Sequence, residues 1–175
     1  FDAHPRRVLE RVLDRYRARG ITPVVAVELE FYLFDRLADA DGRPQPTLNA
    51  SSGARNASTQ VYSIDDLDEN AAFIDAVAQA CRAQRIPADT AVAEYAPGQF
   101  EINLKHRHDA VGACDDAVLL KRVIKAIAQQ QGALASFMAK PLTGQAGNGL
   151  HLHVSVLDTE GRNLFAGTPE APADA

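Results

Sequence analysis

Residues 22–35 read Thr-Pro-Val-Val-Ala-Val-Glu-Leu-Glu-Phe-Tyr-Leu-Phe-Asp. β-Branched and aromatic residues dominate this stretch, which indicates a β-strand. Two carboxylates, Glu28 and Glu30, interrupt the apolar run, and residues i and i+2 of a strand point to the same face of a sheet. Carboxylates are rarely buried unless they are paired or bound to a metal, so this face is not simple core. A half-solvated sheet with one polar side is the less specific interpretation.

Two further segments place polar or metal-capable residues at the same spacing: Gln99, Glu101 and Asn103, with Glu94 across a Pro-Gly turn, and His151, His153 and Ser155. If the three polar faces form one side of a sheet, four glutamates and two histidines converge. Their mutual repulsion would raise the pKa values of the carboxylates unless cations were present. Two divalent metals would relieve the repulsion. Carboxylate oxygens suit Mg²⁺ or Mn²⁺, and an imidazole ligand favours Mn²⁺.

The motif His151-Leu152-His153 is weak by itself, because structural strands and single-metal sites share its spacing. A zinc site would need a third ligand and an open coordination position. The surplus of carboxylates favours a magnesium or manganese pair. The remaining histidines, His4, His106 and His108, are interpreted as surface or loop residues.

Residues 144–149, Gly-Gln-Ala-Gly-Asn-Gly, form a glycine-rich turn before an expected strand. Backbone N–H groups of such a turn can bind phosphate. No Lys-Ser or Lys-Thr follows, and a strand rather than a helix comes next, so this is not a Walker-type loop. A plain mobile turn is the simpler interpretation.

Separate helices and short strands are expected along the rest of the chain. Periodicity predicts helices over residues 5–19, 66–85 and 109–132, strands over 89–95, 99–105, 134–138 and 150–157, and a long loop over 36–62. The turn Ala96-Pro97-Gly98 is typical of a hairpin. Residues 167–172 are expected to form a loop. Hairpins mixed with separate helices indicate an α+β fold, a mainly antiparallel sheet flanked by helices.

Composition excludes several classes of function. The 175 residues suit one domain, and a hydrophobic share of 46% is enough for a buried core. The net charge of -5 disfavours nucleic-acid binding, and no apolar run approaches the roughly 20 residues of a membrane span. Cys81 and Cys114 are expected to be free, buried thiols of a reducing compartment, which indicates a cytoplasmic protein. The chain lacks an initiator Met and is expected to begin inside a longer protein.

Three segments, in this order, resemble the catalytic domain of the glutamine synthetase family. They are Val27-Glu28-Leu29-Glu30-Phe31-Tyr32-Leu33-Phe34, then Glu94-Tyr95-Ala96-Pro97-Gly98-Gln99-Phe100-Glu101, then Lys140-Pro141 through Gly149-Leu150-His151-Leu152-His153-Val154-Ser155. The resemblance implies that residues 1–175 form part of that catalytic domain. It also implies that the family's small N-terminal β-grasp domain and the later part of the catalytic domain lie outside this chain.

The resemblance implies a role for each of these residues by position. Glu30, Glu94 and Glu101 would be ligands of a first metal, and Glu28 and His151 of a second. His153, Ser155 and Asp89 would lie at the nucleotide site. Gly147 matches a glycine that contacts the glutamate substrate, whereas Lys140-Pro141 is interpreted as structural support.

The implied reaction is ATP-dependent amide formation from glutamate and ammonia or an amine, through a γ-glutamyl phosphate, with two or more Mg²⁺ or Mn²⁺ ions per site. Members of the family form hexameric rings, commonly paired as a dodecamer, with active sites between subunits. Residues 1–175 alone are therefore expected to be inactive.

This chain departs from the best-known members at three places. Val92-Ala93 stand where those members have two histidines, the turn between Glu94 and Glu101 is one residue shorter, and Ala146 replaces a loop asparagine. These departures favour the γ-glutamylpolyamine synthetase branch over ammonia-using members. Two other hypotheses are a non-catalytic relative kept for binding or assembly, and a different metal-dependent phosphoryl-transfer enzyme. A non-catalytic relative has no reason to keep repelling carboxylates.

Overall fold

The computed structural model describes residues 1–167, so the expected loop beyond Gly167 lies outside the described residues. The elements follow in the order α1 (Pro5–Arg17), β1 (Thr22–Asp35), α2 (Ile64–Glu69), α3 (Ala71–Gln84), β2 (Ala88–Ala93), β3 (Gln99–Leu104), α4 (Ala110–Gln130), β4 (Ala133–Ser136) and β5 (Leu150–Leu157). The α+β fold expected from the sequence is confirmed. None of the helices within these 167 residues has the length and apolar character needed to span a bilayer.

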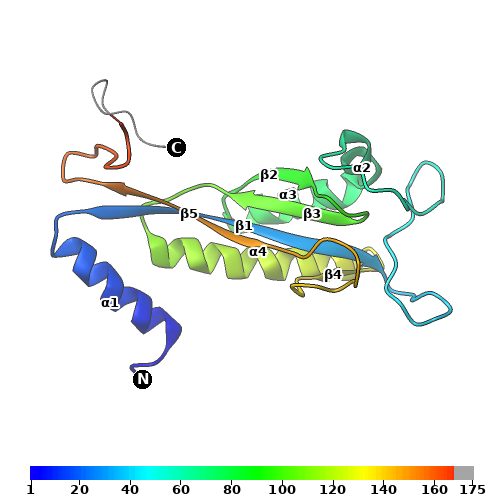
Figure 1. The fold of residues 1–175 in the computed structure, drawn as a ribbon, viewed down its shortest axis with the longest axis horizontal. Helices are drawn as coiled ribbons and strands as arrows, with labels where there is room; N and C mark the ends of the chain where they lie inside the picture. The colour runs from blue at the N-terminus through cyan, green and yellow to red at the C-terminus, as the bar shows by residue number, and fades with distance from the viewer. Residues whose placement is uncertain (168–175) are drawn as a thin grey trace.

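β1 lies at the centre of an antiparallel sheet and contacts three other strands (Figure 1). The strand order is β2-β3-β1-β4. β5 pairs with residues 22–29 of β1, on the same side of β1 as β4 and opposite β3. The register places Glu30 directly opposite Glu101 on β3 and Glu28 opposite His151 on β5. The three polar segments of the sequence therefore lie side by side.

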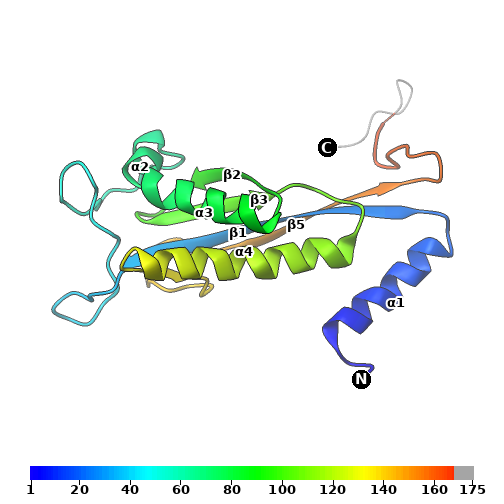
Figure 2. The ribbon, with the colours of Figure 1, turned by 180° about the vertical axis from the view of Figure 1, so that it is seen from behind.

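Helices α3 and α4 cover one face of this sheet, as Figure 2 shows from behind. The odd-numbered residues of β1 point into this core, and Phe31 is fully buried among the rings of Phe73, Phe100 and Phe137. Because side chains alternate along a strand, the even-numbered residues of β1 point to the opposite face. No helix covers that face within the described residues, and it carries the acidic side chains.

Two expectations about the helices are wrong. The single helix expected over residues 66–85 is two helices, α2 and α3, which meet at Asn70. The Asn70 side chain donates to the Asp66 carbonyl at 2.9 Å, and this local bond to the backbone competes with continuation of the helix. Cys81 is buried as expected, but Cys114 is exposed because it lies on the solvent side of α4.

Candidate metal centre

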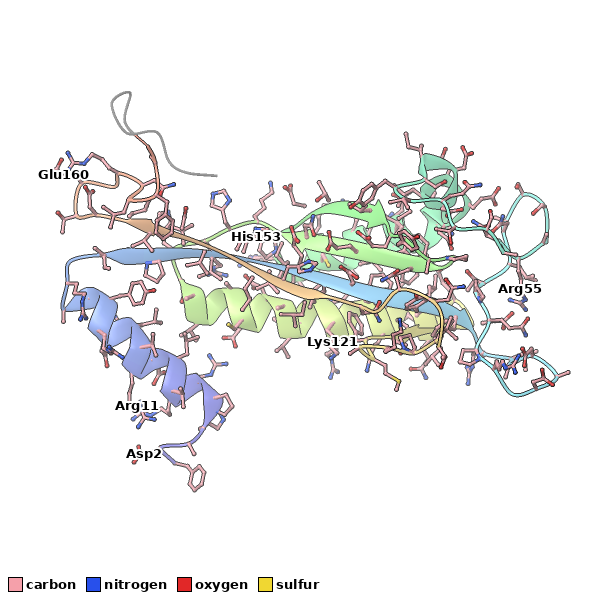
Figure 3. All side chains as sticks on the ribbon, viewed as in Figure 1. Asp2, Arg11, Arg55, Lys121, His153 and Glu160 are labelled. Carbon is pink, nitrogen blue, oxygen red and sulfur yellow. The ribbon has the colours of Figure 1, made fainter. Side chains whose placement is uncertain are left out.

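Two histidines of β5 contact the glutamates of β1 and β3 on the open face of the sheet. His151 Nδ1 lies 3.2 Å from Glu28 Oε2, 3.5 Å from Glu101 Oε2 and 3.8 Å from Glu30 Oε1. His153 Nε2 lies 3.0 Å from Glu28 Oε1, and Figure 3 labels this histidine midway along the sheet. Side chains more than a hundred residues apart in the sequence thus share one small region.

The acidic cluster divides into two groups of three residues, Glu28, Glu101 and His151 in one and Glu30, Glu94 and Glu101 in the other. Within each group the candidate ligand atoms all lie within 4.8 Å of one another. The division follows the two ligand sets expected from the sequence, with Glu101 common to both. Metal ligation by these residues remains a prediction.

The electrostatics of the cluster favour a bound cation. Glu30 and Glu101 are 11% and 10% exposed and face each other across the β1–β3 ladder, where like charges repel. Within residues 1–167, no lysine or arginine forms an ion pair with any of the four glutamates. Burial, followed by the neighbouring carboxylates, raises the pKa values of Glu94 and Glu101. The chain itself therefore supplies little positive charge to balance these groups.

The donor atoms fit magnesium or manganese. The two groups offer carboxylate oxygens and one imidazole nitrogen, a set that suits hard divalent cations. Asn103 is paired with Glu28 across the ladder and shares its face, and its Oδ1 atom is buried without a hydrogen-bond partner among the described residues. An unsatisfied acceptor beside the carboxylates suits a metal-bound water molecule.

The raised pKa values predict a pH-dependent effect of metal on stability. Without metal, Glu94 and Glu101 of the folded protein keep their protons at pH values above the ordinary carboxyl pKa of 4.5. The folded state therefore loses stability as the pH rises above 4.5 and these groups become charged. A divalent cation offsets the repulsion once both groups are charged. We therefore expect Mn²⁺ to raise the melting temperature more at neutral than at mildly acidic pH, as measured by thermal unfolding of the complete protein carrying this chain. An equal rise at both pH values would contradict this expectation.

The glycine-rich turn, residues 144–149, is anchored beside the acidic cluster. Tyr32 Oη donates to the Ala146 carbonyl at 2.7 Å, and burial, with a smaller effect of Glu30, raises the pKa of Tyr32 to about 12, which keeps the donor protonated. Asn148 Nδ2 donates to the Met138 carbonyl at 2.8 Å, and the Gly149 N–H donates to Glu30 Oε2 at 2.9 Å. The turn is therefore held in place, and Gly147 is exposed at its surface.

Gly149 approaches the cluster so closely that a side chain does not fit. A Cβ atom there would lie 2.7 Å from His151 Nε2 and 2.9 Å from Glu30 Oε1. We expect Gly149→Ala to displace these two candidate ligands and weaken Mn²⁺ binding at least about 10-fold while the protein stays folded. Gly42→Ala is the control: a Cβ at Gly42 meets no atom within 4 Å, and the strain of its φ of +78° falls in an exposed loop away from the cluster. Mn²⁺ titration of both variants makes the test, and unchanged affinity in Gly149→Ala would contradict the close contact.

The residues expected at the nucleotide site separate into two places. His153 and Ser155 line an open cavity of about 670 Å³ that also touches Glu28. His106 and His108 are exposed in the loop between β3 and α4, as expected, and line the same cavity. The structure does not bring Asp89 to this cavity. Asp89 lies at the start of β2, where its Oδ1 is 3.4 Å from Lys105 Nζ.

The sequence interpretation gave no role to Gln99, Tyr32 or Asn148, although all three contact the turn or the cluster. One signal was available for Gln99, which stands two positions before Glu101 and therefore on its face of the strand. For Tyr32 and Asn148 the partners are backbone carbonyls of distant or irregular segments, which a sequence pattern does not indicate.

Known proteins are similar to this chain over almost its whole length. A family model described as glutamine synthetase, catalytic domain, matches residues 2–174. The chain belongs to the glutamine synthetase family. This family member is 47% identical to gamma-glutamylputrescine synthetase PuuA of Escherichia coli (strain K12) over 166 residues, which is 95% of this chain and 35% of PuuA. It is 33% identical to glutamate–isopropylamine ligase of Pseudomonas sp over 169 residues, 96% of this chain and 36% of that ligase.

Solved structures share the fold. Apo GmaS without ligand superposes with a TM-score of 0.80 and 30% identity over 97% of this chain and 38% of GmaS. A GmaS/ADP complex gives a TM-score of 0.79 and 29% identity, over 97% of this chain and 37% of that one. This glutamine synthetase-family chain thus spans little more than a third of the relatives that it matches.

Proposed function

We propose that the complete protein carrying this chain is an ATP-dependent ligase that joins the γ-carboxylate of glutamate to an amine. The observation that carries the proposal is the acidic cluster, in which two groups of candidate ligands share Glu101 and contain no lysine or arginine partner within the described residues. Such a site suits a reaction in which negative phosphate groups must be held and neutralised. Membership in the glutamine synthetase family supports the same class of reaction.

The chain's own residues would divide the work among three neighbouring regions. Glu30, Glu94 and Glu101 would hold one Mg²⁺ or Mn²⁺, and Glu28 and His151 the other. When bound, these ions would neutralise phosphate oxygens and the charge that spreads in the transition state. The cavity lined by His153 and Ser155 would take the nucleotide, and a GmaS neighbour is known as an ADP complex. The turn containing Gly147 would receive glutamate.

The bond changes balance over two steps. A γ-carboxylate oxygen of glutamate bonds to the terminal phosphorus of ATP, and the bond from that phosphorus to ADP breaks. The amine nitrogen then bonds to the γ-carbonyl carbon, and the carbon–oxygen bond to phosphate breaks. A cationic amine loses two protons, one to become a nucleophile and one as the amide forms. The released phosphate and solvent can accept them, since the four glutamates are assigned to the metals.

An amine larger than ammonia is the second substrate that the comparisons support. The two relatives reported above are named for putrescine and isopropylamine. In this chain Ala146 and Val92 replace polar residues of the best-known ammonia-using members, and Val92 is paired with Glu101 across the β2–β3 ladder. Ala93, the neighbouring replacement, is buried in the core behind the sheet. We propose a polyamine or another alkylamine as the acceptor.

Family membership also supports a homo-oligomer of hexameric rings for the complete protein. Residues 1–175 alone are expected to be inactive, because the resemblance assigns further arginines and a glutamate of the site to regions outside them. Turnover by residues 1–175 alone would contradict this part of the proposal.

The proposal is tested by ADP release from the complete protein with Mg²⁺ or Mn²⁺, with and without glutamate, against ammonia, putrescine and isopropylamine. We expect release that needs both glutamate and an amine, and faster release with an alkylamine than with ammonia. ADP release with ammonia, but with neither putrescine nor isopropylamine, would overturn the choice of amine. No release with any amine, despite metal binding, would overturn the ligase itself.

A further inference from the structure

Gln99 is a buried amide at the junction of the acidic cluster and the glycine-rich turn. It lies at the start of β3 and is 2% exposed. Its Nε2 donates to Glu30 Oε2 at 3.0 Å, to the Gly147 carbonyl at 3.0 Å and to Asn148 Oδ1 at 3.3 Å. Its Oε1 accepts from the Ala96 N–H at 3.2 Å.

These four contacts fix which way the amide faces. The Ala96 N–H is a donor and needs the amide oxygen, so the amide nitrogen must point toward Glu30 and the turn. The Ala96 N–H thus binds the amide oxygen and the Gly147 carbonyl binds the amide nitrogen, although these two residues lie far apart in the sequence. A flipped amide would place oxygen against three acceptors. Gln99 therefore joins the β2–β3 hairpin, Glu30 and the turn in one arrangement.

The two carboxylate oxygens of Glu30 have different neighbours. Oε2 accepts from both Gln99 Nε2 and the Gly149 N–H, at 3.0 and 2.9 Å. Oε1 points toward the cluster, 3.8 Å from His151 Nδ1. One oxygen of this carboxylate is thus held by the protein, and the other faces the remaining candidate ligands. Glu30 connects the cluster directly to the end of the turn.

We propose that Gln99 is a positioning residue that couples the metal centre to the turn of residues 144–149. The inference rests on the proposed function for the identity of the metal and of the substrate glutamate. A cation that restrains Glu30 also restrains the amide and the Gly149 N–H, and through the amide it restrains the Gly147 carbonyl. Coupling of this kind is reciprocal, so an ordered turn also favours cation binding.

A first experiment uses the unmodified complete protein without substrates. Hydrogen–deuterium exchange is followed with and without Mn²⁺ for the amides of residues 146–149 and, as an internal reference, for residues 39–43. We expect Mn²⁺ to slow exchange in the turn at least about fivefold and to leave the reference loop unchanged. Equal exchange of the turn in both conditions, at saturating Mn²⁺, would overturn the coupling.

A second experiment compares Gln99→Met with Gln130→Met. Methionine keeps the length and approximate volume of glutamine but removes the amide, whereas Gln130 is exposed near the end of α4. We expect Gln99→Met to bind Mn²⁺ about 10- to 100-fold more weakly in an electron paramagnetic resonance titration and to lose the Mn²⁺-dependent protection of the turn. The control should match the wild type in both measurements.

The outcomes separate the coupling from the proposed function. A folded Gln99→Met protein with wild-type Mn²⁺ affinity and protection overturns the coupling alone, and so does a wild type that forms the amide product but shows no protection. A wild type that binds no Mn²⁺ contradicts the metal centre and the coupling together. If Gln99→Met does not fold, the exchange experiment on the wild type decides the matter.

Discussion

Glu101→Gln in the complete protein is expected to reduce ligase turnover more than about 100-fold. Glu101 belongs to both candidate ligand groups, so the substitution removes a charged oxygen donor from each of them. The amide has nearly the same shape as the carboxylate, which keeps the packing of a side chain that is 10% exposed. The measurement is ADP release in the presence of glutamate and an amine, together with a Mn²⁺ titration.

The melting temperature of Glu101→Gln shows whether the variant has lost a metal ligand or has lost its fold. Replacing Glu101 removes one of two like charges that face each other across the β1–β3 ladder. Metal-free Glu101→Gln should therefore melt at or above the wild-type temperature, while the stabilisation by Mn²⁺ disappears. Glu10→Gln on α1 is the matched control and should keep activity and the Mn²⁺ effect. A Glu101→Gln variant that retains both would contradict the ligand assignment.

Val77→Asp is expected to destabilise the fold strongly. Val77 lies on α3 and is 1% exposed in the core between the helices and the sheet. An aspartate there buries a carboxylate that has no partner, at a cost of about 4 kcal/mol or more. Because domains are stable by only about 5–15 kcal/mol, this cost removes a large share of the stability. It should lower the melting temperature by roughly 8–16 °C.

Gln79→Asp provides the control for this prediction, because Gln79 is exposed on the same helix. Soluble yield and thermal unfolding of the two variants make the comparison. We expect Gln79→Asp to unfold within a few degrees of the wild type. A cooperative, near-normal transition for Val77→Asp would mean that this face of α3 is not core.

The faces of the strands were predictable because their physical cause is local. Alternation along β1, β3 and β5 depends only on strand geometry, so Glu28 and Glu30, or His151 and His153, must share a face. The pairing of the strands was harder to predict from the sequence, because it depends on contacts between distant segments. The position of Glu30 opposite Glu101, and with it the sharing of Glu101 between two groups, follows from that register.

The features that the sequence did not indicate depend on side-chain contacts at long range. Gln99 reads as one more polar residue of a half-solvated strand, and its partners in the turn lie 48 and 49 residues away. Asn70 reads as part of a helix until its bond to the Asp66 carbonyl is seen. Asp89 was expected near the nucleotide, but it lies at the start of the edge strand β2, which β3 separates from β1, and its partner is Lys105.

The central claim is that the acidic cluster on the open face of the sheet is a two-metal centre. The most direct measurement is anomalous diffraction from crystals of the complete protein grown with Mn²⁺. The account predicts two manganese peaks per chain, one among Glu30, Glu94 and Glu101 and the other beside Glu28 and His151, with Glu101 within reach of both. Occupied manganese sites elsewhere and none at these five residues would contradict it.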